Sequence, residues 1–477
     1  MDRFLGIDGI SHRSTHETHW TVETTAIATR KPPCPNCGPH DRMESKGLVR
    51  CRIQDTPTRG KPATISIERR RFRCLVCNAS VTQTGPPAAK GPTEDGRKKL
   101  TARLLLYIQN QVTKRPVRHV ARETGVPEAT VRDIALELAD ALNTHHRFPT
   151  PAVLGMDGLK INGTEYMVIG DADDGHLIAI VERATTKAVR EWMMAYDFDV
   201  GAVDVFVSDM HPVNKSMARK ELQSALHIAD KWHIVHNFQK KILSRAVDVA
   251  VSDLRAGNHD KAVERNLELA QALDDLKPAV MSVSHARLRK RRRHRKGDQH
   301  SIDFGSDLKP ILDKVDSVSR AYWARYDLIE MYQSATLAEA KACRNRCIDR
   351  LQPLLADKSL AAEVRRYIGH LTRNEQAIFN YFERIRLRPN GKVRGPTTNV
   401  LEQRNGMIRA IWRSGKGIPT LPLIRLRAIY GQWTIGLDIV QCAAAGCPKF
   451  HGPLIGPPIP LHMQHPETGW RCPTHVI

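Results

Sequence analysis

The fold is decided by residues 152–181, AVLGMDGLKINGTEYMVIGDADDGHLIAIV, which contain three apolar runs at Ala152–Ile161, Tyr166–Gly170 and Leu177–Val181. Short apolar runs bounded by Gly, Asn and Asp are typical of β-strands. Residues Asp171–Gly175 have the composition of a turn and join the second and third runs as a hairpin. The stretch therefore predicts three consecutive strands that form a meander.

The chain beyond the meander alternates between helix and strand. We expect a helix over Thr186–Tyr196, a buried strand over Val203–Val207, a second helix from Pro212, and a fifth strand over Ala225–Ala229. A three-stranded meander followed by helix, strand, helix and strand is the order of a ribonuclease-H-like sheet. In such a sheet the first and fourth strands are neighbours.

Two carboxylates fall on these neighbouring strands. Asp157 lies within the first strand, where aspartate is disfavoured, and Asp209 directly follows the fourth. Asp209 is poorly placed to cap the next helix, because Pro212 puts that cap at His211. Side by side, the two carboxylates can share hard divalent cations such as Mg²⁺. The ordinary alternative is that each is a turn or cap residue.

A third carboxylate, Glu402, lies far along the chain on a predicted helix within residues 398–435. Glu402, Asn405 and Arg409 recur at i, i+3 and i+7, so they share one face of that helix, while an apolar stripe covers the other. A carboxylate, an amide and a guanidinium on one face suit a metal ion beside a phosphodiester. Taken alone, Glu402 would be a solvated helix residue.

Four cysteines near the N-terminus have the spacing of a zinc site. They form two C-x-x-C pairs, Cys34 with Cys37 and Cys74 with Cys77, and β-like sequence separates the pairs. Each pair can place two thiolates on a single tetrahedral Zn²⁺. Chance pairing or a redox motif is the alternative. Cys51 has no partner at ligand spacing, and we expect it to be a bystander.

Residues 113–134 have the pattern of a helix-turn-helix. Two short amphipathic stretches flank Gly125, which permits a left-handed turn. The second helix would then face outward with Glu128, Thr130 and Arg132, and such a face reads base edges in the major groove of DNA. An ordinary helical hairpin is the alternative interpretation.

The charge of the chain favours a polyanionic partner. Its 477 residues include 73 Lys and Arg against 51 Asp and Glu, a net charge of +22. Eight of the ten residues from Arg287 to Lys296 are basic, which suggests a clamp on phosphates or merely a basic loop. We expect DNA contacts from Arg289, Lys290, Arg291, Arg292 and Arg293 in this run, and from Arg409. No apolar run is long enough to span a membrane and no secretory signal is evident, so a cytoplasmic protein is expected.

These patterns predict a multidomain α/β protein. Its regions are a zinc ribbon at 1–85, a helix-turn-helix domain at 95–147, the first part of a ribonuclease-H-like core at 150–240, an all-helical insertion at 241–390, the C-terminal helical part of the core at 391–440, and a Pro/Gly/His-rich tail at 441–477. In the tail, Cys442, Cys447, Cys472 and His475 have a spacing that leaves a second zinc site open.

From about Cys34 to Tyr430 the chain resembles the DDE transposases of bacterial insertion sequences, in particular the ISL-three (ISL3) family. The matching stretches are the two C-x-x-C pairs, the helix-turn-helix, residues 154–157 (LGMD), 207–210 (VSDM), 228–235 (IADKWHIV), 401–406 (LEQRNG) and 413–417 (RSGKG). The chain departs from the family at Gly158, where an acidic residue is frequent.

The resemblance implies a metal-binding triad at Asp157, Asp209 and Glu402, and a D-x-x-H signature at Asp230 and His233. Either the latter pair belongs to the site or its DNA, or Asp230 binds backbone N–H groups at a helix start while His233 packs beside Trp232. The enzyme would hold two Mg²⁺ (or Mn²⁺) ions at the triad and one structural Zn²⁺, and would cut and join DNA by two-metal phosphoryl transfer.

The expected partners are the terminal inverted repeats of the element, target DNA and further copies of the chain on DNA, in a bacterial cytoplasm close to the nucleoid. Two alternatives remain open: a non-catalytic DNA-binding regulator derived from a transposase, and a metal-dependent nuclease without joining activity.

Overall fold

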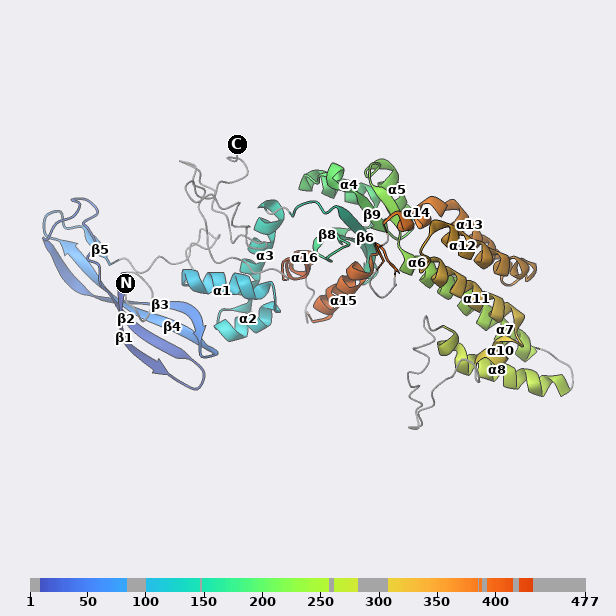
Figure 1. The fold of residues 1–477 in the computed structure, drawn as a ribbon. Coiled ribbons are helices and arrows are strands. Elements are labelled where there is room, and N and C mark those ends of the chain that lie inside the picture. The colour runs from blue at the N-terminus through green and yellow to red at the C-terminus, as the bar shows by residue number, and fades with distance from the viewer. Residues whose placement is uncertain are drawn as a thin grey trace. The chain divides into compact units, whose positions relative to one another are not determined.

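The computed structural model describes residues 9–83, 100–145, 148–256, 261–281, 308–384, 386–387, 393–414 and 420–431 (Figure 1). The chain divides into two compact units, Met1–Phe148 with Gly406–Ile477, and Pro149–Asn405. The basic run 287–296 and the tail residues Cys442, Cys447, Cys472 and His475 lie outside the described residues. Within the described part, none of the helices combines the length and apolarity that a membrane span requires.

The first unit begins with a five-stranded sheet. Its order is β1-β2-β4-β3, and β5 pairs with β4. The long β3–β4 hairpin turns at Arg59 and Gly60, whose φ angles of 54° and 74° match the twist that a two-residue hairpin needs. Much of the β-like sequence between the two cysteine pairs lies in β3 and β4. The strands are β1 (Ile10–Glu17), β2 (Val22–Ala28), β3 (Met43–Thr58), β4 (Lys61–Cys74) and β5 (Ser80–Thr82).

The helices of the first unit pack around α3. They are α1 (Ala102–Val112), α2 (Val117–Thr124), α3 (Glu128–His145) and α16 (Leu421–Tyr430). Gly125 ends α2 in the left-handed conformation at φ 70°, as the sequence predicted, and Val126, Val131 and Ile134 are buried. The buried Asp55 of β3 accepts hydrogen bonds from Thr101 and Arg103, which attaches the sheet to these helices.

The second unit is built on a five-stranded sheet of order β10-β9-β6-β7-β8. Strands β6, β7 and β8 form the predicted antiparallel meander, and β9 and β10 run parallel to β6. Alternate residues of β6 point to opposite faces, so Leu154 and Met156 pack under the helices α4 and α5, whereas Gly155 and Asp157 point to the other face. The elements are β6 (Val153–Ile161), β7 (Thr164–Asp171), β8 (Leu177–Glu182), α4 (Thr186–Tyr196), β9 (Val205–Ser208), α5 (Pro212–Lys220) and β10 (Leu226–Ala229).

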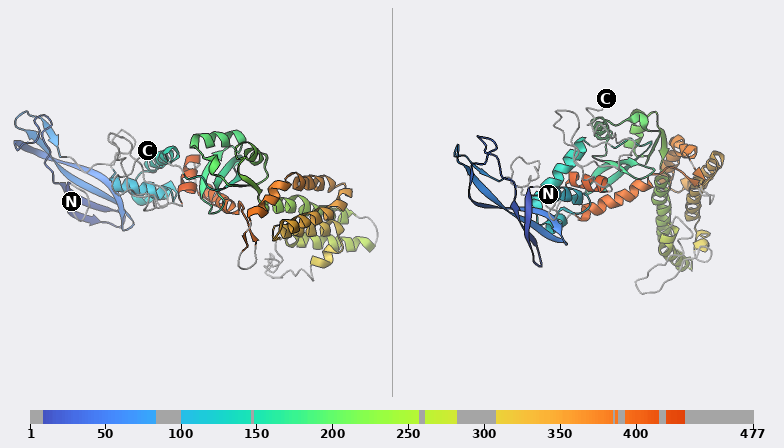
Figure 2. Two further views of the ribbon diagram at one scale, coloured as in Figure 1. Left: turned by 45° about the horizontal axis from the view of Figure 1, so that its top comes forward. Right: turned by 60° about the vertical axis from the view of Figure 1, so that its left-hand side comes forward.

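After the sheet the described chain is helical through Arg384, but Arg386–Leu387 form a strand inside the region 241–390 that we predicted to be all-helical. The helices share one apolar core with β9 and β10, and α11, α12 and α13 lie side by side (Figure 2). Cys343 and Cys347 of α12 are buried in this core. The helices are α6 (Lys231–Phe238), a π-helical stretch Gln239–Leu243, α7 (Ser244–Ala256), α8 (Lys261–Val280), α10 (Lys309–Leu312), α11 (Asp316–Met331), α12 (Leu337–Leu351), α13 (Ala361–Arg373) and α14 (Glu375–Phe379), with 3-10 turns at Val200–Ala202, Gln352–Ala356 and Asn380–Arg384.

A short hairpin of β11 (Arg386–Leu387) and β12 (Val393–Arg394) precedes the helix α15 (Asn399–Ser414). The first residues of α15 belong to the second unit, and they return the chain to its sheet.

Candidate active site

The sheet brings two of the predicted acids to adjacent positions. In the parallel pair β6–β9, Met156 lies opposite Ser208, so Asp157 and Asp209 each come one residue further along. Asp157 is only 5% exposed and points to the face that α15 occupies. Next to it, Gly158 lines a hollow of about 140 Å³ together with Asp209 and Asn214, which leaves this side of the site open.

Two glycines of the sheet allow α15 to pack closely against it. Gly155 of β6 and Gly170 of β7 lie directly opposite each other in the register. A Cβ on Gly155 would lie 2.5 Å from Cδ1 of Leu401, and a Cβ on Gly170 would lie 2.9 Å from Cδ2 of the same side chain. Leu401 is completely buried in the space that the missing side chains leave. The contact positions its neighbour Glu402 close to Asp157.

Asp230 attaches the start of α15 to α6. Its Oδ1 accepts the backbone N–H of Trp232 at 2.9 Å and the hydroxyl of Thr397 at 3.0 Å. Its Oδ2 accepts the backbone N–H of Thr398 at 3.0 Å and the hydroxyl of the same residue. Asp230 is fully buried, and these four donors account for its charge. We call this arrangement the Asp230 clasp.

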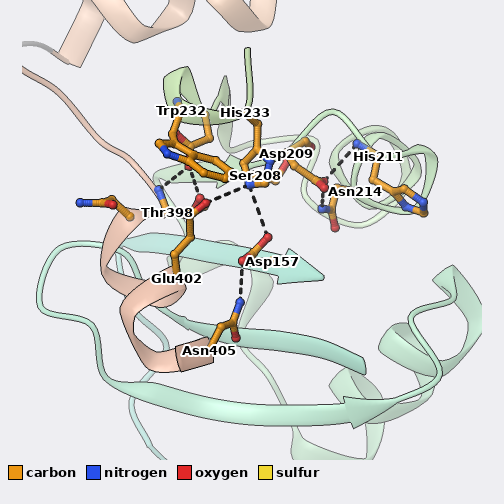
Figure 3. Close-up of polar contacts among 12 residues, drawn as sticks. Asp157, Ser208, Asp209, His211, Asn214, Trp232, His233, Thr398, Glu402 and Asn405 are labelled. Atoms are coloured by element: carbon orange, nitrogen blue, oxygen red, sulfur yellow. Dashed lines mark hydrogen bonds and ion pairs between the residues drawn. The ribbon is translucent and has the colours of Figure 1, made fainter. Parts of the chain in front are cut away.

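His233 lies between two of the predicted acids. Its Nε2 is 3.5 Å from Oδ1 of Asp157 and 3.5 Å from Oε1 of Glu402 (Figure 3). Ligand atoms of these three residues lie within 4.8 Å of one another, a grouping that can hold a metal ion. Asn405, predicted on the same helix face as Glu402, donates a hydrogen bond of 2.6 Å to Oδ2 of Asp157.

Asp209 lies outside this grouping in the structure. Its Oδ1 accepts the backbone N–H of His211 at 3.1 Å and the amide of Asn214 at 2.6 Å. His211 is the N-cap of α5, as Pro212 predicted. The predicted triad is therefore represented in the grouping by Asp157 and Glu402, with His233 as the third member.

The acids change the charge of the histidine. Burial alone would lower the pKa of His233, but contact with Asp157 and the charges of Asp230 and Asp209 raise this pKa from 6.5 to about 9. At neutral pH the side chain is an imidazolium between two carboxylates. A positive charge thus lies where a bound cation would be attracted.

The contacts of Asp230 and His233 include features of both interpretations of this pair. Asp230 binds backbone N–H groups at a helix start, and His233 contacts Trp232 edge-on with ring centroids 4.9 Å apart. His233 also belongs to the acid grouping. The tertiary bonds from Asp230 to Thr397 and Thr398 were not predicted, because sequence spacing carries no signal for a pairing of two distant segments.

The structure describes four of the residues predicted to contact DNA. Glu128 and Arg132 are exposed on the first turns of α3 and pair with each other at 3.3 Å, with Thr130 between them. Arg409 is exposed on α15. Residues Arg289, Lys290, Arg291, Arg292 and Arg293 lie outside the described residues.

The four N-terminal cysteines converge as the spacing predicted. Ligand atoms of Cys34, Cys37, Cys74 and Cys77 lie within 4.8 Å of one another, and Cys51 is not among them. The residue that follows each C-x-x-C pair has a left-handed backbone conformation, Gly38 at φ 77° and Asn78 at φ 61°. Backbone N–H groups point at the sulfurs, for example from Cys37 to Sγ of Cys34 at 3.4 Å. The cluster has the donors and the convergence that bind Zn²⁺.

One neighbour of the cysteine cluster was missed. Nε2 of His40 lies 3.3 Å from Sγ of Cys74, so its ring can donate to a thiolate. His40 follows Cys37 at C-x-x-H spacing, a signal that our sequence analysis did not use.

The fold and the site define a mixed α/β protein with two potential metal centres, a cysteine cluster and a carboxylate–histidine grouping on a five-stranded sheet. A family model described as a transposase, that of the ISL3-type DDE proteins, matches residues 154–427. The chain therefore belongs to the ISL3 family of DDE transposases, which confirms the resemblance. Comparison with curated proteins found no match.

Proposed function

We propose that this protein is a DDE transposase that binds the terminal inverted repeats of an insertion sequence, cleaves the DNA strands there and transfers them to a target. The convergence of Asp157, His233 and Glu402 carries the proposal, since side chains from β6, α6 and α15 meet at one grouping within the matched residues. The strand order β10-β9-β6-β7-β8 supports a ribonuclease-H-like core.

The donor set fits hard divalent cations. Carboxylate oxygens are the ligands that Mg²⁺ and Mn²⁺ prefer, and Asp157, Asp209 and Glu402 would hold two such ions. Nε2 of His233 is buried and 3.5 Å from each carboxylate, a distance too long for a strong hydrogen bond, so the acids keep coordinating capacity. Bound divalent ions activate the attacking hydroxyl and stabilise the departing 3′ oxygen in phosphoryl transfer.

The residues of the chain would position and neutralise the reacting groups. Asn405 fixes one oxygen of Asp157. The Asp230 clasp and Leu401 hold the first turn of α15, and with it Glu402. The chemistry requires no protein nucleophile, and catalysis would come from electrostatic preorganisation.

The first unit would recognise DNA. We propose that α2 and α3 form the helix-turn-helix, that Glu128, Thr130 and Arg132 face the major groove, and that one Zn²⁺ on the four cysteines stabilises the ribbon. The basic run 287–296 and Arg409 would contact phosphates. Joining two transposon ends implies at least two copies of the chain on DNA, working at the bacterial nucleoid.

The test is Mg²⁺-dependent cleavage of DNA carrying the inverted repeats that flank the gene. Asp157→Asn and Glu402→Gln are expected to abolish cleavage while leaving repeat binding intact, and Asp199→Asn, an exposed aspartate of the same unit, is the matched control. If the wild type binds the repeats but never cleaves them, the regulator alternative is favoured.

A second substrate separates the transposase from the nuclease. A pre-cut end with a free 3′-OH is supplied together with a target plasmid. A joined product supports the transposase, whereas hydrolysis without any joined product supports the nuclease.

A further inference from the structure

The outer face of α6 carries an exposed aromatic pair beside the acid grouping. Trp232 is 41% exposed, although it is a large apolar side chain in the first turn of a helix. Its ring stacks on that of His236, with centroids 4.3 Å apart and planes inclined by 8°. Figure 3 shows Trp232 next to His233, on the same side of the site as Glu402.

The two rings of the pair are nearly parallel. Burial, together with the charges of His233 and Lys240, lowers the pKa of His236. Lys240 follows one turn beyond His236 and is exposed. An exposed indole, an imidazole stacked on it and a nearby ammonium group form the combination that single-stranded nucleic acids bind by base stacking and phosphate contact.

The alternative is that Trp232 merely shields the site. A shielding side chain would be buried by its neighbours, whereas two-fifths of Trp232 remains accessible beside its edge-on contact with His233 and its stacking on His236. The exposed part of the indole can be reached by a planar ligand. The bases of a duplex are already stacked on one another, so a strand held at Asp157 and Glu402 can offer a base face to the indole only where it is unpaired.

We propose that Trp232, supported by His236, is a stacking platform for an unpaired base of the DNA strand held at the acid grouping, with Lys240 binding an adjacent phosphate. The inference rests on the proposed function and deepens it, since it assigns the site a preference for locally unpaired DNA. It requires no additional reactant, because stacking involves no covalent step.

The experiment compares two DNA probes that share one duplex sequence, one blunt and one with three unpaired nucleotides at a 3′ end. Binding of the full chain is measured by fluorescence anisotropy in EDTA, so that cleavage cannot contribute. The wild type is expected to bind the frayed probe more tightly. Trp232→Leu should weaken binding of the frayed probe about tenfold and leave the blunt probe unchanged, because Leu removes the ring but keeps an apolar side chain.

Trp232→Phe keeps a ring and should retain most of the preference. Leu337→Ala is the matched control, because Leu337 is also apolar, lies in the first turn of a helix and is 42% exposed. Thermal unfolding of each variant identifies any loss of binding that comes from misfolding. If Trp232→Leu does not fold, Trp232→Phe is compared with the wild type instead.

The inference is overturned if the wild type binds both probes equally, or if a folded Trp232→Leu keeps the preference. Either result leaves the proposed function intact when the wild type cleaves and joins DNA in Mg²⁺. A wild type that neither binds nor cleaves DNA refutes the proposed function and this inference together.

Discussion

Replacing Asp230 by asparagine tests whether the clasp holds the site together. The side chains have nearly the same shape, but asparagine has one acceptor oxygen where aspartate has two. The backbone N–H groups of Trp232 and Thr398 approach opposite oxygens of Asp230, at 2.9 and 3.0 Å. One of them must therefore face the amide NH₂ of Asn, whereas the hydroxyls of Thr397 and Thr398 can rotate and accept.

The expected loss follows from that geometry. A buried N–H without an acceptor costs about 1–3 kcal/mol, and Asp230 and Thr398 are fully buried. If about 2 kcal/mol is lost from the attachment of α15, local opening of this helix becomes about 30-fold more frequent. A displacement of Glu402 by about 1 Å would reduce cleavage on the order of 100-fold.

Two assays separate these effects. Amide hydrogen exchange followed by mass spectrometry is expected to accelerate in peptides covering Asn399–Ser414 but not in those covering α4. Mg²⁺-dependent cleavage of the repeats should fall in parallel. Asp199→Asn is the control, because Asp199 is exposed and caps a single N–H, that of Gly201 at 3.0 Å. Unchanged exchange over α15, with Asp230→Asn otherwise folded, would refute the reasoning.

Three further perturbations address other parts of the structure. Gly155→Ala would place a Cβ 2.5 Å from Leu401 and should lower the free energy of unfolding, measured by urea titration, by about 1–3 kcal/mol. In the double variant with Leu401→Ala, the loss of unfolding free energy should be smaller than the sum of the losses in the two single variants. In EDTA, the wild type should be more stable than His233→Gln, with the full difference in unfolding free energy below about pH 6.5. This difference should disappear as the pH rises to about 9, because the pKa of His233 is higher in the folded than in the unfolded chain. A difference that grows with pH would contradict the ion pairs of His233 with Asp157 and Glu402. Atomic emission is expected to find one zinc per chain in the wild type; Cys74→Ser should lose this zinc and loosen the ribbon, whereas Cys51→Ser, outside the cluster, should keep the zinc and the fold of the ribbon.

Periodicity and residue type were sufficient to predict the elements of the sheet. The strands of the meander, the buried strand before Asp209 and the cap at His211 all depend on local chemistry, and the structure has them where the sequence placed them. Two close C-x-x-C pairs were likewise enough to predict the convergence of Cys34, Cys37, Cys74 and Cys77.

Features that depend on distant segments carried no such signal. Gly155 and Gly170 look like ordinary strand interruptions until Leu401, more than two hundred residues later, is seen between them. The place of His233 between Asp157 and Glu402 depends on where α15 returns to the sheet. Sequence spacing cannot predict where α15 meets the sheet, because that position is set by the tertiary packing of the intervening helices.

The acid grouping therefore depends on how α15 is anchored rather than on the sheet alone. Thr398 is held by Asp230 and Leu401 by the two glycines, and both anchors lie within the turn that also bears Glu402. The two anchors restrain this turn in complementary ways. The hydrogen bonds of Asp230 hold it near α6, and the contact of Leu401 with Gly155 and Gly170 holds it against β6 and β7. Two residues of the D-x-x-H signature consequently act on the same acid by different routes: Asp230 positions the backbone that carries Glu402, whereas His233 meets its carboxylate directly. Loss of either should disturb Glu402, but only loss of Asp230 should release the helix.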